Sequence, residues 1–349
     1  TVKGGNFGGE SVSQVRTVQI GGTACTPVSW NDNSVVCRLA AGTGASKPAF
    51  VKIQADGDAN RDQSSNVASM FSYNSPIIQL LSPSNHPAAG GGTLTVFGTN
   101  FGVNSSLIHV SVGSTACTSV STGNNNTASP QTIQCRVASG SGIGHGINVL
   151  VDGQNAQSPQ VTFNYDGPVI SAIEPRNGPT VGAFFMTVFG VNFGTAAVDA
   201  QVSFFPASRP TGGPSLSVIQ ISDTAASFTV PANVGTDSVI SVIVKSQAGS
   251  LQGAFCYDAP RVTAFLPTSG NRPTSGGFDM TVIGANFGTA ATANVVSVKV
   301  GGKQCTSVSV IVNHTSLTCV APNGTGAAAA IVVTVANLTS ASNLAFRRS

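Results

Sequence analysis

Short runs in which apolar and polar residues alternate recur along the whole chain, and this two-residue period predicts β-strands. Residues 161–165, for example, place Phe163 and Tyr165 on one face of a strand and Asn164 on the other. Clusters of Gly, Pro, Asn and Ser separate the runs and favour turns. An amphipathic helical pattern of even two turns is hard to find, so the sequence predicts an all-β protein.

In the first part of the chain the alternation predicts five strands. They cover residues 15–20, 23–30, 35–39, 50–56 and 67–73, and a last strand of the chain is expected near 343–346. Trp30, the only tryptophan, ends the second of these strands. We expect it to pack near the neighbouring cysteines rather than to serve as a ligand platform.

One octapeptide recurs four times, at the start of a turn that follows an apolar strand. It reads TVKGGNFG at residues 1–8, TVFGTNFG at 95–102, TVFGVNFG at 187–194 and TVIGANFG at 281–288. Successive asparagines of this motif lie 94, 92 and 94 residues apart. That period is too long for a solenoid and suits a string of autonomous domains of about 90 residues.

The motif has a direct physical interpretation as a strand that runs into a tight turn. Its Thr, Val and Phe or Ile favour a pleated, half-buried surface. The two glycines that bracket Asn-Phe allow positive φ or a close backbone approach, and the Asn tolerates left-handed geometry. We expect the Phe to fold back and close the end of a core, and the motif as a whole to be architectural rather than chemical.

The octapeptide resembles the hallmark of the IPT/TIG family, immunoglobulin-like domains found in plexins, transcription factors and many surface proteins. Upstream segments extend the resemblance: IIQLLSP at 77–83 with GGG at 90–92, ISAIEP at 170–175 with GPTVG at 178–182, and VTAFLP at 262–267 with SGG at 275–277. The resemblance covers essentially the whole chain. It implies four tandem immunoglobulin-like β-sandwiches of about seven strands each, where complete.

The expected domains are residues 1–75, 76–166, 167–258 and 259–349. The first begins inside its second strand, so we expect either a piece of a longer chain or a first strand supplied by another copy through edge pairing. Domains 1 to 3 end in aromatic strands that are followed within three residues by Pro76, Pro168 and Pro260. Such short linkers predict semi-rigid connections between the domains.

Seven cysteines give the strongest indication of the cellular compartment. Cys25 and Cys37 lie in repeat 1, Cys117 and Cys135 in repeat 2, and Cys305 and Cys319 in repeat 4, and the first of each pair follows its motif Asn by 17 to 19 residues. This placement predicts three intradomain disulfides and an oxidising compartment. Neither a CxxC spacing nor a histidine cluster supports zinc as an alternative.

Repeat 3 departs from this pattern. Its cysteine positions are replaced around Phe204-Phe205 and Phe228-Thr229, so aromatic volume is expected to substitute for the crosslink. Cys256 is left over on an outward position. It is either an intermolecular or reactive cysteine, or a thiol shielded near a domain junction.

Five Asn-x-Ser/Thr sequences are candidate N-glycosylation sites, which would make the protein a glycoprotein. They are Asn104, Asn125, Asn313, Asn323 and Asn337.

Charge and missing motifs exclude several functions. Charged residues are 8% of the chain, against about 25% in typical proteins, and the net charge is +3 without a basic cluster, so nucleic-acid binding is not expected. No apolar run reaches the ~18 residues that a membrane span needs. The acidic segment 56–62 lacks the glycine at position 6 and the glutamate at position 12 of an EF-hand calcium loop, so we interpret it as a turn and expect no metal. The repeats contain no recurring histidine and no recurring pair of carboxylates that would indicate a catalytic site. We therefore expect neither enzyme activity nor a cofactor.

These observations favour a rod with a structural or adhesive role, located outside the cell or on its surface. Such a rod could be a subunit of a surface filament or appendage. Its expected partners are copies of itself or another surface protein, with strand addition at domain 1 as one mode of assembly. The alternative is the ligand-binding stalk of a plexin-like receptor. A carbohydrate-binding module would need an exposed aromatic platform, and a DNA-associated protein a basic loop, and the sequence offers little of either.

Overall fold

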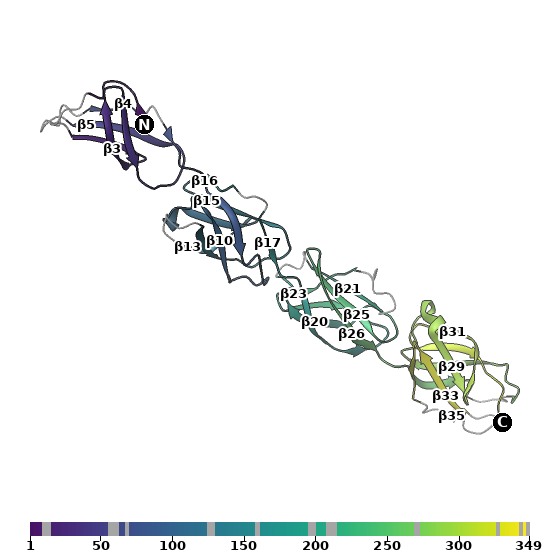
Figure 1. Ribbon diagram of the computed structural model, residues 1–349. Helices are drawn as coiled ribbons and strands as arrows, with labels where there is room; N and C mark the ends of the chain where they lie inside the picture. The colour runs from purple at the N-terminus through teal and green to yellow at the C-terminus, as the bar shows by residue number, and fades with distance from the viewer. Residues whose placement is uncertain are drawn as a thin grey trace. The chain divides into compact units, whose positions relative to one another are not determined.

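The computed structural model contains four β-rich domains, numbered 1 to 4 in chain order (Figure 1). It describes residues 1–8, 15–54, 63–66, 70–123, 130–157, 161–194, 200–206, 215–268, 273–325, 329–341 and 345–346. The chain divides into two compact units. The first comprises residues 1–86, 90–139 and 143–165, and the second comprises 87–89, 140–142 and 166–349.

Domain 1 forms one hydrogen-bonded sheet in the order β1-β4-β3-β2-β5-β6, with β7 paired to β5. Its strands are β1 (Val2–Lys3), β2 (Val15–Ile20), β3 (Thr23–Asn31), β4 (Ser34–Leu39), β5 (Lys47–Gln54), β6 (Gln63–Ser64) and β7 (Met70–Phe71). The long β3 pairs with both β2 and β4. It therefore joins strands that belong to separate sheets in the other domains.

Domain 2 is a sandwich of two sheets, β13-β14-β10-β8 and β12-β11-β15-β17-β9, with β16 paired to β15. Its elements are β8 (Ile77–Ser82), β9 (Asn85–His86), β10 (Thr93–Thr99), the 3-10 helix η2 (Ser105–Leu107), β11 (Ile108–Val112), β12 (Thr115–Ala116), β13 (Thr118–Thr122), β14 (Gln131–Arg136), β15 (His145–Val151), β16 (Gln154–Asn155) and β17 (Thr162–Tyr165).

Domains 3 and 4 repeat the two-sheet plan of domain 2. The sheets are β18-β20-β24-β23 and β19-β26-β25-β21-β22 in domain 3, and β27-β28-β32-β31 and β30-β29-β33-β34, with β35 on β33, in domain 4. The domain 3 strands are β18 (Val169–Glu174), β19 (Asn177–Gly178), β20 (Phe185–Val191), β21 (Ala200–Pro206), β22 (Ser215–Leu216), β23 (Gln220–Ser222), β24 (Ala225–Thr229), β25 (Ser238–Val244) and β26 (Gln247–Tyr257). Domain 4 contains β27 (Arg261–Leu266), β28 (Asp279–Ala285), the 3-10 helix η4 (Ala290–Val295), β29 (Val296–Val300), β30 (Lys303–Gln304), β31 (Thr306–Val312), β32 (Ser316–Val320), β33 (Ala329–Val335), β34 (Leu338–Thr339) and β35 (Ala345–Phe346).

The recurring motif behaves as its composition predicts. Its strand becomes β10, β20 or β28, the second strand of a four-stranded sheet, and its Asn turns the backbone into the left-handed region with φ of 61–64° at Asn100, Asn192 and Asn286. The Phe that follows then folds into the core, where Phe101, Phe193 and Phe287 are at most 1% exposed. The same turn in domain 1 buries Phe7 almost as fully.

The first glycine of the motif is required for a close backbone approach. A β-bulge lies between Phe97 and Gly98 where β10 pairs with β8. A Cβ atom on Gly98 would lie 2.0 Å from the Ile77 carbonyl oxygen, and the equivalent glycines Gly190 and Gly284 face equally close carbonyls. Because a backbone oxygen cannot retreat like a flexible side chain, only glycine fits here.

We therefore expect Gly98→Ala to destabilise domain 2 by about 2–3 kcal/mol through overpacking. The matched control is Gly146→Ala on β15 of the same domain, where an added Cβ meets nothing within 4 Å. Amide hydrogen exchange of peptides from β10 and β15, measured in increasing denaturant, gives the free energy of unfolding of domain 2 in each variant. Equal stability of the two variants would contradict the steric role of Gly98.

Domains 2, 3 and 4 each have one apolar core between their two sheets. Among the described residues, the clusters contain 16 buried residues in domain 2, 16 in domain 3 and 14 in domain 4, against seven in domain 1. In domain 1 a cavity of about 390 Å³ lies beside the core and is lined in part by Leu39, Met70 and Phe71. The alternation that buries Phe163 in the last strand of domain 2 predicts a buried Phe71 at the same place in domain 1. This prediction is wrong, because Phe71 is 37% exposed at the edge of the cavity.

All three tyrosines of the chain close the same loop. Tyr73, Tyr165 and Tyr257 donate a hydrogen bond from the phenol to the carbonyl oxygens of Ala40, Ala138 and Pro231, respectively. Burial raises the pKa of Tyr165 and Tyr257 and so favours the protonated phenol, the form that donates these bonds. The alternating C-terminal strand of domains 1 to 3 thus also tethers the loop that follows β4, β14 or β24.

Candidate functional site

The asparagine of the motif lies where the chain enters each domain, and its side chain holds the incoming linker. Asn100 Nδ2 donates to the Ser75 carbonyl oxygen at 3.0 Å. Asn192 does the same to Gly167, and Asn286 to Ala259, each at 3.1 Å. Since the same residue also forms the left-handed turn, one Asn fixes both the turn and the path of the linker.

In the second unit, the side-chain oxygen Oδ1 of this asparagine contacts the preceding domain. Asn286 Oδ1 accepts from the Thr180 N–H at 3.2 Å, and Asn192 Oδ1 accepts from the Ala88 N–H at 3.0 Å. Thr180 and Ala88 are 1% and 2% exposed, so these bonds are shielded from water. Both donors belong to a Pro-x-x-Gly loop, at 179–182 and 87–90. The asparagine is therefore a junction residue, a role that its sequence pattern alone did not predict.

The second glycine of the motif contacts a side chain of the preceding domain. Added Cβ atoms would lie 2.8 Å from Val234 at Gly288, 3.8 Å from Ser141 at Gly194 and 2.6 Å from Thr43 at Gly102. All three glycines have φ between 70 and 80°. A residue of the loop after β4, β14 or β24 thus packs on the next motif at each junction.

The junction between domains 1 and 2, inside the first unit, adds an ion pair. Lys47 Nζ lies 2.6 Å from Asp152 Oδ2, with the two side chains 26% and 23% exposed. Thr43 donates from Oγ1 to the same carboxylate at 3.2 Å. Asp152 also forms a tight turn with φ of 47°, so one residue shapes the turn and contacts the neighbouring domain.

His314 completes the junction between domains 3 and 4. Its Nδ1 lies 2.8 Å from Thr180 Oγ1, and its backbone carbonyl oxygen accepts from the Phe287 N–H. Burial lowers the pKa of His314 because the imidazolium form loses hydration at this junction. The neutral ring is therefore the form that fits the junction.

We expect acid to weaken this region through His314. Because its pKa is lower in the folded protein than the ordinary value of about 6.5, the stabilisation is fully present above that pH and is lost as pH falls through the folded value. The thermal midpoint of domain 4 should drop more between pH 7 and pH 5 than in His314→Asn. Asn is the appropriate replacement because residue 314 has φ of 67°. Identical pH profiles of the two proteins would contradict the role of His314.

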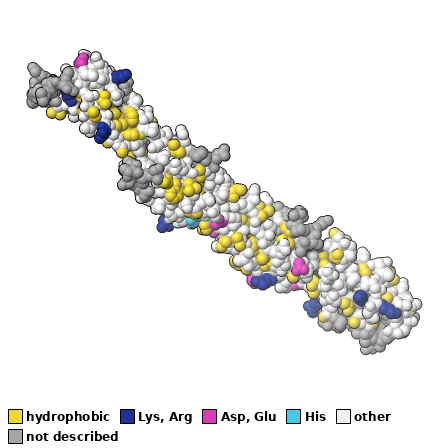
Figure 2. All heavy atoms as spheres, in the orientation of Figure 1, with side chains coloured by type: hydrophobic (Ala, Val, Ile, Leu, Met, Phe, Trp, Pro, Cys, Tyr) yellow, Lys and Arg dark blue, Asp and Glu magenta, His cyan; other side chains and the backbone are white. Residues whose placement is uncertain are grey.

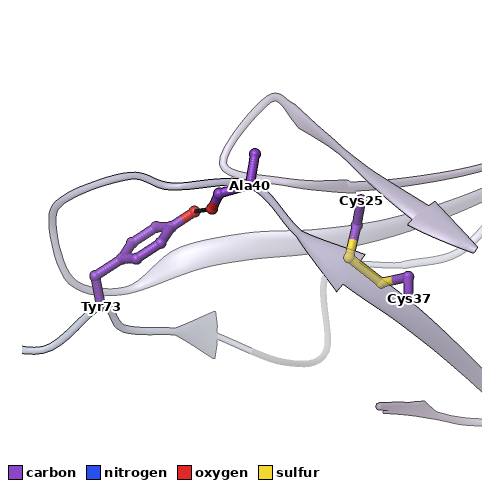
Figure 3. The surroundings of a disulfide bond; sticks show 4 residues. All are labelled: Cys25, Cys37, Ala40 and Tyr73. Atoms are coloured by element: carbon purple, nitrogen blue, oxygen red, sulfur yellow. Dashed lines mark hydrogen bonds between the residues drawn. A yellow bond between two sulfur atoms is a disulfide. The ribbon is translucent and has the colours of Figure 1, made fainter. Parts of the chain in front are cut away.

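The six expected disulfide cysteines come together in pairs. Cys25 and Cys37 form a disulfide with an S–S distance of 2.07 Å and a Cα–Cα distance of 5.5 Å (Figure 3). Cys117 with Cys135, and Cys305 with Cys319, are adjacent thiols rather than disulfides in the structure. The backbone N–H groups of Cys117 and Cys305 donate to Val110 and Val298, the register equivalents of Val18 opposite Cys25.

The thiol pair of domain 2 is polarised. The hydrogen bond between the two side chains lowers the pKa of Cys117 and raises that of Cys135, and burial raises the pKa of Cys135 further. In domain 4 the pKa of Cys319 is raised, mainly by the side-chain hydrogen bond with Cys305 and secondly by burial. Oxidation of these two pairs remains a prediction.

Domain 3 fills the crosslink position with aromatic rings. Phe228 pairs with Met186, the register position that Cys135 and Cys319 hold opposite Leu94 and Met280. Its ring centroid lies 6.3 Å from that of Phe204, and both side chains are buried. Cys256 is half-buried on β26, beside β19, and its N–H donates to the Arg176 carbonyl oxygen.

The candidate glycosylation sites have different surroundings. Asn104, Asn313, Asn323 and Asn337 are exposed, whereas Asn125 lies outside the described residues. Asn104 Oδ1 accepts from the N–H and the Oγ of Ser106, and Asn323 Oδ1 accepts from Lys303 Nζ at 3.0 Å. None of the four is buried, so each is sterically open to modification.

The remaining sequence candidates are structural or lie outside the description. Trp30 is 7% exposed, donates to the Phe7 carbonyl oxygen and is covered by the Arg16 guanidinium at 5.3 Å, so it is a core residue. The segment 56–62 lies outside the described residues. Within the described part of the chain, no group of three His, Cys, Asp or Glu side chains could hold a metal ion. In the same part, no helix has the length and apolarity to cross a membrane.

The fold and its junctions define a tandem array of immunoglobulin-like β-sandwich domains. The family model of the IPT/TIG domain matches four segments, residues 1–73, 76–165, 168–257 and 260–347. The chain therefore belongs to the IPT/TIG family, and the resemblance inferred from the octapeptide is confirmed.

Known relatives match parts of the chain. Human Plexin-B3 is 33% identical over 139 residues, which is 40% of this chain and 7% of that protein. Human Fibrocystin-L is 28% identical over 208 residues, 58% of this chain and 4% of that protein. The chain thus spans less than a tenth of either relative. A solved structure of the full extracellular region of Plexin A4 aligns with a TM-score of 0.27 and 16% identity, covering 98% of this chain and 36% of that one.

Proposed function

We propose that this chain is an extracellular segment of tandem immunoglobulin-like domains with a structural or adhesive role and without catalytic activity. The placement of its cysteines carries the proposal. Three domains bring two cysteines to the same register position, and one pair is bonded. Disulfides at repeated positions are typical of proteins that fold in an oxidising compartment.

The surface supports the same role. The face in Figure 2 carries few charged side chains, and these are scattered. A face with so few charged side chains suits contacts with other proteins better than contacts with nucleic acid. We propose copies of this chain or another surface protein as partners. Strand addition at β1 of domain 1 is one route to such contacts.

The compartment can be tested on intact source cells with a membrane-impermeant biotin reagent. We expect labelling before lysis, and peptide mapping without reduction should recover Cys117 linked to Cys135 and Cys305 linked to Cys319. Labelling that occurs only after lysis, together with alkylatable thiols at these four positions, would overturn the proposal.

A second candidate is the ligand-binding stalk of a plexin-like receptor, favoured by the 33% identity with Plexin-B3. Electron microscopy of native material separates the two. Ordered fibres support a filament subunit, whereas isolated molecules that retain a soluble ligand support the stalk.

A further inference from the structure

The outer face of one sheet in domain 3 carries two exposed aromatic rings. Phe185 and Phe189 lie on β20 and are 68% and 42% exposed, whereas Met186 and Val188 between them are fully buried. Because side chains alternate along a strand, both rings and the intervening Thr187 project from the same, outer face of the sheet. The outer face of an antiparallel sheet is normally polar, so a pair of exposed rings on one strand is unusual.

The fold does not require these two rings. The residues at the same motif positions are Thr93 and Phe97 in domain 2, and Asp279 and Ile283 in domain 4. The neighbouring strand also differs, since Phe97 pairs with Leu80 and is half-buried, whereas Phe189 pairs with the small Ala172. Domain 3 therefore exposes an aromatic surface that the same sheet lacks in its neighbours.

A carboxylate lies beside the two rings. Glu174, the last residue of β18, pairs with Thr187, and cross-strand partners project from the same face. Glu174 is thus the diagonal neighbour of both Phe185 and Phe189, at a spacing of about 7–8 Å that long side chains can span. It is exposed and forms no ion pair with any described residue. The face therefore combines aromatic surface with a negative charge that is not neutralised locally.

The hydroxyl groups of this face already have partners within the domain. Thr187 Oγ1 and Ser227 Oγ lie 2.9 Å apart, and Ser171 Oγ donates to the Phe189 carbonyl oxygen at 3.1 Å. A sugar ring carries many hydroxyls and would need several hydrogen-bonding side chains next to the aromatic surface. One carboxylate beside two rings is a better match for a single cation.

The apolar part of the face is too small for a stable contact between two folded domains. Val169 and Val191 pair with each other and are 57% and 48% exposed at its end. Together with the two rings they expose roughly 400 Å², by the usual sizes of these side chains. A stable protein–protein interface buries about 800 Å² per partner. A short segment that presents one or two side chains fits this area better than a second copy of the chain.

We propose that the outer face of domain 3 binds an arginine side chain presented by a short segment of a partner protein. The guanidinium group stacks on the ring of Phe185 or Phe189 and donates two parallel N–H bonds to the Glu174 carboxylate. Arginine suits the site better than lysine because its planar group can make both contacts at once. This inference rests on the proposed adhesive role and names the chemistry of one partner.

Titration of the full chain, followed by NMR of isotope-labelled phenylalanine rings, tests the site. The probe is a capped tripeptide with arginine between two leucines, and the reference peptide carries citrulline, the neutral analogue of arginine, at its centre. Phe185→Ala and Glu174→Gln change exposed side chains of the site, so both variants should fold. The matched control is Asp279→Asn, which removes an exposed carboxylate from the same sheet face of domain 4.

We expect the ring signals of Phe185 and Phe189 to shift and saturate with the arginine peptide. The affinity should fall about fivefold in Phe185→Ala, in Glu174→Gln and with the citrulline peptide, because each change removes the cation–π contact or the ion pair. It should stay the same in Asp279→Asn.

Three results would overturn the proposal: no saturable shift, equal binding of the two peptides, or unchanged affinity in Glu174→Gln. A response to a glucan hexasaccharide without one to the arginine peptide would overturn it as well, and would make this face a glycan platform. Labelling of the chain on intact cells does not depend on this site, so the extracellular role can survive its loss.

Discussion

Replacing Phe193 by alanine is expected to destabilise domain 3 by about 3–5 kcal/mol, the usual cost of truncating a fully buried aromatic ring. Phe193 is 0% exposed, and domain 3 has no disulfide to limit the unfolded chain. Amide exchange of peptides from β20 and β25 in increasing denaturant measures the loss. We expect protection in domain 3 to collapse while that of domain 2 remains.

The matched control lies four residues earlier, on the strand that leads into this turn. Phe189 is 42% exposed on the outer face of β20, so Phe189→Ala should change the free energy of unfolding far less, by about 1 kcal/mol or below. Comparable losses in the two variants would mean that the turn does not place its Phe in the core.

Removing the disulfide of domain 1 has the second large effect. The double variant Cys25→Ser, Cys37→Ser should lower the stability of this domain by about 3 kcal/mol, because the bond closes a loop with a sequence separation of 12 residues. The core cluster in the described part of this domain has only seven buried residues, so packing there offers little to offset the loss. Trp30 is the only tryptophan of the chain and belongs to this core, so its fluorescence reports domain 1 alone.

Two comparisons make this measurement specific. Cys256→Ser, which changes a cysteine of domain 3, should leave the Trp30 transition in place. Reduction of the parent with a thiol reagent should reproduce the shift of the double variant. A Trp30 transition that is unaffected by either treatment would show that the Cys25–Cys37 bond does not support the domain.

The sequence was sufficient to predict the fold because each domain carries redundant local signals. Alternation placed the strand at 15–20 on β2 (Val15–Ile20), and the last strand on residues that include β35 (Ala345–Phe346). The octapeptide gave the turn, the buried Phe and the left-handed Asn from residue chemistry alone. These features are determined by residues that are close together in the sequence, so a local sequence pattern is enough to predict them.

The junction contacts could not be predicted in the same way, because they join residues about 100 positions apart. Nothing in the environment of Thr180 along the chain shows that it meets Asn286 and His314. One signal was available, since a Pro-x-x-Gly loop precedes the motif strand in domains 2, 3 and 4. The exposed Phe71 is a similar case, because its burial depends on how well distant strands fill the end of domain 1.

The ion pair of Lys47 and Asp152 distinguishes one junction from the others. Added salt screens a partly exposed pair of charges, whereas the neutral bonds of Asn286 and Thr180 carry no net charge to screen. Ionic strength should therefore loosen the connection between domains 1 and 2 and leave that between domains 3 and 4 unchanged. A chain of nearly uniform modules would in this way bend more freely at one hinge than at another as the salinity of its surroundings rises.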